Sequence, residues 1–218
     1  MARNNTRALT LSAMLVAIML ILGFIEQRIP LVPADPHIKL GLSNSVLLFA
    51  VYWLGIPTAF VLMLLKVLLS GFLFAGVNAM LYALAGGTLS VVFMSLFYKG
   101  IHCLPTRSKA VGLLLSLAPM LIGAVGGAMH NVGQVSVAML IFSNNSHVVK
   151  GLFRYMLILA AIGAGMGVFT GFVAKLLIAR LPSSMRPHPP RKERPALQPD
   201  APNSKTSPSG ADSPDGPR

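Results

Sequence analysis

The chain has 218 residues, of which 54% are hydrophobic and only 11% are charged, and its formal net charge is +12. Soluble domains carry about 25% charged residues, so this composition excludes an ordinary water-soluble enzyme and predicts a polytopic, all-α integral membrane protein. Basic loops beside apolar segments usually set membrane orientation, which makes nucleic-acid binding a poor interpretation of the charge, and the single cysteine, Cys103, excludes an intrachain disulfide or a cysteine metal cluster.

The first apolar run covers residues 8–25 and follows two arginines. A signal peptide has a shorter apolar region, about 7–15 residues, that ends at a small-residue cleavage site. This run ends instead in the charged sequence Glu26-Gln27-Arg28. We therefore expect a retained helix, followed by a loop from Glu26 to about Leu40.

Apolar sequence resumes over residues 42–74 and is broken by Gly55-Ile56-Pro57. A membrane span needs about 20 residues, so this stretch is long for one helix, and the break favours two short helices joined by a tight turn. Further spans are expected at residues 78–98, 110–142 and 148–181. The prediction is a six-helix transmembrane bundle formed by residues 1–181.

Loop charges predict the orientation of this bundle. With the N-terminus in the cytoplasm, the inner side holds the two N-terminal arginines, the basic loop 99–109 and Arg180, a moderate bias in the expected direction. The prediction is a multi-pass protein of the plasma (inner) membrane with both termini in the cytoplasm.

Ten of the 37 residues in 182–218 are proline, which predicts a disordered, basic cytoplasmic tail. Its basic cluster at 191–194 fits a solvated tail or contact with anionic lipid.

Glycines recur every four residues in the last two spans, on one face of each helix. Small residues allow two helix backbones to approach closely in lipid, so we interpret this pattern as helix packing rather than ligand binding. The residues are Gly123, Gly127, Gly163, Gly167 and Gly171.

Strongly polar residues lie inside two of the predicted spans. Lys66 is in the middle of the third span, where an unpaired charge costs several kcal/mol; it is either functional, internally paired or snorkelling to the interface. His130 and Gln134 share a face of the fifth span, with Asn131 about 100° away. These three side chains either join helices by hydrogen bonds or contact a ligand. Zinc binding by one histidine with amide neighbours is improbable.

The predicted orientation places most polar residues in the outer half of the bundle. This half holds residues 130–134, Asn44, Asn78, Arg154 and the loop with His37 and Lys39. Such a distribution predicts a cavity open to the outside and sealed below, because a uniform channel would have polar residues along its whole length.

Four segments resemble the Gx transporter family, whose members often carry the label heptaprenyl diphosphate synthase component I. They are Pro36-His37-Ile38-Lys39-Leu40-Gly41-Leu42-Ser43-Asn44, Lys66-Val67-Leu68-Leu69-Ser70-Gly71, Leu84-Ala85-Gly86-Gly87 and Gly127-Ala128-Met129-His130-Asn131-Val132-Gly133-Gln134. The resemblance covers about residues 8–181, although the family usually has arginine at position 66. It also extends to the substrate-binding S components of energy-coupling-factor transporters. These are six-helix bundles with an outward pocket, and small residues of their first helix dock on a transmembrane partner that works with ATPases. Ala13 and Ala17 match that docking pattern.

Three functions follow as hypotheses. The first is a transport protein that captures a small, anionic solute with Lys39, Asn44, Lys66, His130, Asn131 and Gln134, without a cofactor. The second is a non-catalytic membrane subunit of a heptaprenyl diphosphate synthase. Catalysis by this chain alone is not expected, since magnesium-diphosphate needs carboxylate ligands and residues 8–181 contain only Glu26 and Asp35 as acids. The third, a structural scaffold, would not need Lys66 or the polar cluster at 130–134.

The chain has no nucleotide-binding loop, so the energy for transport would come from a partner or an ion gradient.

Overall fold

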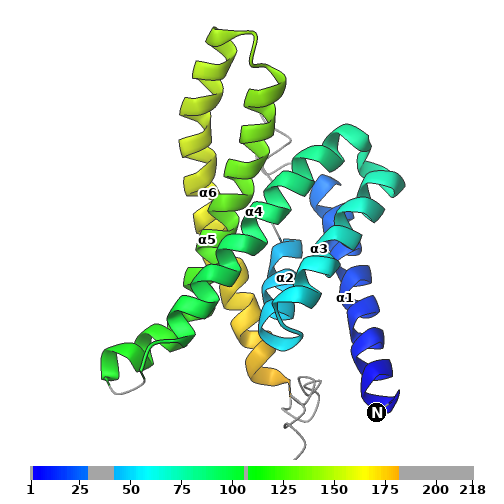
Figure 1. Ribbon diagram of the computed structural model, residues 1–218, viewed down its shortest axis with the longest axis vertical. Helices are drawn as coiled ribbons and strands as arrows, with labels where there is room; N and C mark the ends of the chain where they lie inside the picture. Colours follow the sequence, from blue (N-terminus) through cyan, green and yellow to red (C-terminus); the bar gives the residue numbers. More distant parts are fainter. Residues whose placement is uncertain (1, 29–41, 106–107, 182–218) are drawn as a thin grey trace, which may run out of the picture. The chain divides into compact units, whose positions relative to one another are not determined.

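The computed structural model describes residues 2–28, 42–105 and 108–181 (Figure 1). These residues form six α-helices and one π-helical turn, with no β-strand among them, so the all-α prediction is confirmed for this part of the chain. Lys39 and the predicted tail, 182–218, lie outside the described residues. The elements are α1 (Ala2–Arg28), α2 (Leu42–Trp53), α3 (Ile56–Ser70), η1 (Gly71–Ala75), α4 (Val77–His102), α5 (Lys109–Ile141) and α6 (Ser146–Arg180).

The break between α2 and α3 is built from the residues that predicted it. Gly55 has φ +90°, a backbone conformation that residues with a side chain rarely adopt. Pro57 lies in the first turn of α3, where its missing N–H costs nothing because that group would have no partner within the helix. The prediction of two helices joined by a tight turn is therefore confirmed.

Five of the described helical segments are long and apolar enough to cross a membrane: α1, α3 together with η1, α4, α5 and α6. The exception is α2, whose 12 residues extend about 18 Å at 1.5 Å per residue. A bilayer core is about 30 Å thick. The predicted number of α-helices is confirmed for the described residues, but α2 alone is too short to span.

The short α2 helix is enclosed by its neighbours, since it contacts α1, α3, α5 and α6. A helix that is apolar on all sides is normally buried. Most of the α2 side chains lie in the hydrophobic core, whereas the longer helices expose many large apolar side chains, such as Leu157 on α6. The buried apolar residues of α2 are Val46, Leu47, Leu48, Phe49, Ala50, Val51 and Trp53.

The α5 and α6 helices lie against each other through their glycines (Figure 1). A Cβ atom at Gly127 would collide with the carbonyl oxygen of Gly163, and one at Gly167 would collide with the carbonyl oxygen of Gly123. Gly171 is similarly close to the carbonyl oxygen of Pro119. The prediction that these glycines pack helices together is confirmed, because no larger residue fits at this separation.

Candidate functional site

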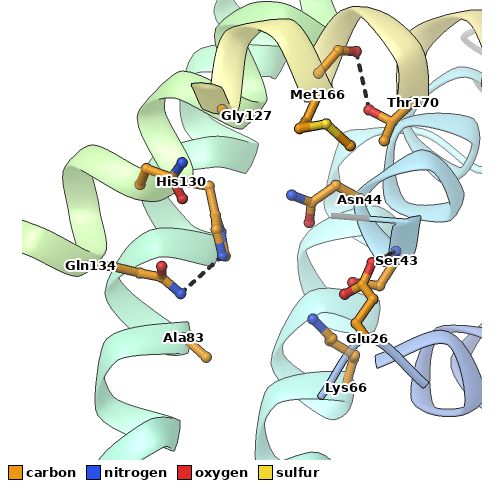
Figure 2. A pocket seen from close by; sticks show the side chains of 13 residues that line it. Glu26, Ser43, Asn44, Lys66, Ala83, Gly127, His130, Gln134, Met166 and Thr170 are labelled. Carbon is orange, nitrogen blue, oxygen red and sulfur yellow. Dashed lines mark hydrogen bonds between the residues drawn. The ribbon is translucent and has the colours of Figure 1, made fainter. Parts of the chain in front are cut away.

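A small pocket of about 60 Å³ is lined by residues of all six α-helices, and five of these helices contribute polar side chains (Figure 2). A water molecule needs about 10–15 Å³ of such space, so the volume suits a small solute rather than a long chain. The lining residues are Glu26 of α1; Ser43 and Asn44 of α2; Lys66 of α3; Ala83 of α4; Gly127, His130, Asn131 and Gln134 of α5; and Gly163, Met166, Gly167 and Thr170 of α6.

Five of the six predicted binding residues line this pocket. They are Asn44, Lys66, His130, Asn131 and Gln134. The sixth, Lys39, lies outside the described residues. Two other polar residues that we expected near the cavity, Asn78 and Arg154, are exposed and do not line the pocket. Ligand binding by the five residues stays a prediction.

The polar residues of α5 divide into two kinds of contact. The Nε2 atoms of Gln134 and His130 are 3.1 Å apart within α5. The Asn131 side chain instead donates a hydrogen bond of 2.7 Å to the carbonyl oxygen of Leu159 in α6. Asn131 therefore joins two helices and also lines the pocket, while its contact with a ligand stays a prediction.

A glycine of α4 allows that helix to lie close to the polar face of α5. A Cβ atom at Gly86 would be 2.6 Å from the carbonyl oxygen of His130 and 2.9 Å from Cγ of Gln134. Because such distances are too short for real Cβ contacts, any larger residue at position 86 would push α4 away from these two side chains. Gly86 thus fixes the wall of the pocket beside His130 and Gln134.

The opposite side of the pocket carries one acidic and one basic residue. The Glu26 side chain is only 6% exposed, and its Oε1 accepts a hydrogen bond of 3.4 Å from the backbone N–H of Ser43. The Cε atom of Lys66 is 3.9 Å from the Cβ position of Gly23, which lies three residues before Glu26 and hence on the same face of α1. Figure 2 shows the charged ends of Glu26 and Lys66 next to each other.

The prediction that a loop begins at Glu26 is wrong, because α1 continues to Arg28 and Glu26 is a buried helical residue. The start of α2 explains the difference, since the N–H of Ser43 gives the carboxylate a partner inside the protein. A sequence signal existed: Glu26 directly follows an apolar run that contains no proline, and the first proline of the chain is Pro30. An acid in that position is a candidate functional residue.

Two hydroxyl residues of the lining were also not predicted. Ser43 donates its backbone N–H to Glu26. Nearly every residue type has a backbone N–H, so the side chain at position 43 does not predict this contact. Thr170 donates a hydrogen bond of 3.0 Å from Oγ1 to the carbonyl oxygen of Gly167, so its hydroxyl group has a hydrogen-bond partner within α6. Among the described residues, no three His, Cys, Asp or Glu side chains come close enough to hold a metal ion.

A family model described as heptaprenyl diphosphate synthase component I matches residues 15–177, which is most of the chain. The chain belongs to this family. No curated protein and no solved structure matches it. The pocket residues of this component I family protein, from Glu26 to Thr170, all lie inside the matched range. The likeness to S components of vitamin transporters stays a prediction.

Proposed function

We propose that the protein is a membrane transport subunit that captures a small, anionic solute in the pocket lined by Lys66, Asn44 and the polar residues of α5. The observation that carries the proposal is the pocket itself: polar side chains from five of the six α-helices converge on one small space. Such side chains are costly inside a membrane bundle and mark substrate or ion sites. A structural scaffold would need no such convergence.

The position of α2 supports an anion as the solute. Transporters place the N-termini of short helices inside the membrane, where their partial positive charge attracts anionic groups. If the turn at Gly55 lies at the membrane surface, the start of α2 lies about 18 Å deep, more than halfway across. Ser43 and Asn44, in the first turn of α2, both line the pocket.

The proposed subunit is oriented with both termini in the cytoplasm and the pocket toward the outside, as the loop charges indicate. Energy for release of the solute comes from a transmembrane coupling partner with ATPases. Ala13 and Ala17 are both on an exposed part of α1, where such a partner can reach them. Small residues at that spacing allow close contact between helices.

A second candidate function is favoured by the family name: a non-catalytic membrane subunit of a heptaprenyl diphosphate synthase. Purified chain mixed with isopentenyl diphosphate, an allylic diphosphate and Mg²⁺ should form no prenyl product, because Glu26 is the only acidic residue among those that the structure describes and magnesium-diphosphate needs several carboxylate ligands. Product formation by the chain alone would overturn both candidate functions.

Mass spectrometry of the solutes that co-purify with the protein tests the transport proposal. The wild-type protein should carry a small molecule that is depleted in Lys66→Met, which removes the charge and keeps much of the apolar stem. Lys66→Arg is the matched control, since it keeps the charge and should retain the solute. Loss of a buried polar partner costs about 1–3 kcal/mol, or about tenfold or more in affinity. The same solute content in all three proteins, or no solute in the wild type, would contradict the proposal.

A further inference from the structure

One side of the pocket already holds a carboxylate. Glu26 reaches from the end of α1 to the first turn of α2, where its Oε1 accepts the N–H of Ser43. The first N–H groups of an α-helix have no partner within the helix, and they carry partial positive charge. Lys66 brings its ammonium group to the same side of the pocket (Figure 2). The start of α2 and Lys66 therefore have the geometry of a carboxylate-binding site.

The charges of this site limit what can enter it. Glu26 and Lys66 together contribute no net charge to the pocket. An added anion would place two negative groups beside one ammonium group in a region of low dielectric constant, where like charges interact strongly. Two carboxylates that share a site are not both ionised at low cost. Anion entry is favourable only if one negative charge is neutralised at the same time.

We propose that a solute carboxylate competes with Glu26 for the start of α2 and Lys66, and that Glu26 takes up one proton when it is displaced. The solute keeps its negative charge and binds where the Glu26 carboxylate lies. Glu26 receives a proton from water and becomes a neutral carboxylic acid, so the charge of the pocket is unchanged. This inference rests on the proposed function and names its substrate class, a small carboxylate that binds together with a proton.

Few other titratable groups face Glu26 among the described residues. Lys66 comes from α3 and His130 from α5, while the pocket residues of α2, α4 and α6 are uncharged. On α1 itself, Arg28 is exposed and its guanidinium lies 5.0 Å from the centre of the Phe24 ring. Protonation of His130 would add positive charge on the α5 side, so the experiment must separate His130 from Glu26.

Acetate, pyruvate and succinate serve as probes for purified protein in lipid nanodiscs, with chloride as the control anion. Calorimetric titration in two buffers of different ionisation enthalpy counts the protons taken up with each probe. At neutral pH we expect one proton per carboxylate bound and an affinity that falls about tenfold per unit of rising pH. Chloride lacks the paired oxygens of a carboxylate, so it should show neither measurable binding nor proton uptake.

Glu26→Gln resembles the protonated side chain and separates the two titratable groups. This variant should bind the carboxylate more tightly than the wild type at neutral pH, without proton uptake. Arg28→Gln, a charge change on an exposed residue of α1, should behave as the wild type. If Glu26→Gln still takes up a proton, His130 is the acceptor and the inference fails.

Infrared difference spectra of the wild type provide a measurement that does not depend on the folding of a variant. Addition of ¹³C-labelled acetate should produce the carbonyl band of a protonated carboxyl group from the protein. Binding without this band would overturn the inference and leave the proposed function standing. If no carboxylate binds to the wild type or to Glu26→Gln, the inference is also overturned, and the mass of the co-purified solute then decides the proposed function separately.

Discussion

The side-chain amide of Asn131 donates a hydrogen bond of 2.7 Å to the backbone carbonyl oxygen of Leu159, 28 residues further along the chain. The bond joins α5 to α6, and Asn131 also lines the pocket. The Cβ position of Gly163 is 2.6 Å from Nδ2 of Asn131, so the amide lies directly over the backbone of α6. Helix packing and the shape of the pocket are thus coupled at one residue.

Asn131→Ala should therefore lower stability, whereas Gln134→Ala should not. Gln134 contacts His130 within the same helix, so its loss separates no helices. Hydrogen bonds between membrane helices are worth about 0.6 kcal/mol on average and up to about 1.7, and we expect a loss in this range for Asn131→Ala. Thermal unfolding in detergent measures the difference. Equal melting temperatures for the two variants would show that the bond to Leu159 contributes nothing.

A second prediction concerns the contact between α5 and α6. Gly167→Ala should destabilise the protein strongly, because the added methyl group would collide with the backbone of Gly123 and Ala124. Gly165→Ala is the matched control two residues away in α6, since nothing lies within 4 Å of its Cβ position. Alanine is favoured over glycine within a helix by about 1 kcal/mol, so the control should be neutral or more stable. Comparable losses of folded protein in both variants would contradict this packing.

Much of the fold was predictable because its signals are local. The break between α2 and α3 follows from Gly55 and Pro57, which lie two residues apart in the chain. The glycines that recur every four residues in α5 and α6 are the residues through which these two helices contact each other. The full enclosure of α2 was not predictable, because an apolar sequence looks the same whether it faces lipid or other helices.

The site was predictable where polar residues interrupt apolar helices, as at Lys66 and His130. Glu26 was missed because it stands at the end of an apolar run, where an acid usually marks the beginning of a loop. Its burial depends on a backbone N–H of α2 that is 17 residues away in sequence. No side-chain pattern encodes that contact.

A third prediction concerns orientation. The loop charges place both termini in the cytoplasm. A reporter that is active only outside the cell, fused after Leu181, should be inactive, and a cytoplasm-only reporter at the same position should be active. A fusion in the α5–α6 turn, at residues 142–145, should give the opposite result. Activity of the exterior reporter after Leu181 would contradict the proposed orientation.

Thiol labelling in intact cells tests most directly whether the pocket is a site that can be reached from outside. Cys103 is the only cysteine, so Cys103→Ser gives a background into which single cysteines can be placed. Gln134→Cys places a thiol in the pocket seven residues before the end of α5. Phe153→Cys is the control: it lies seven residues after the start of α6 and is 54% exposed on an apolar surface. We predict that a charged, membrane-impermeant thiol reagent added outside labels Gln134→Cys and not Phe153→Cys. Labelling of Gln134→Cys only from the cytoplasmic side, or no labelling from either side, would contradict the account.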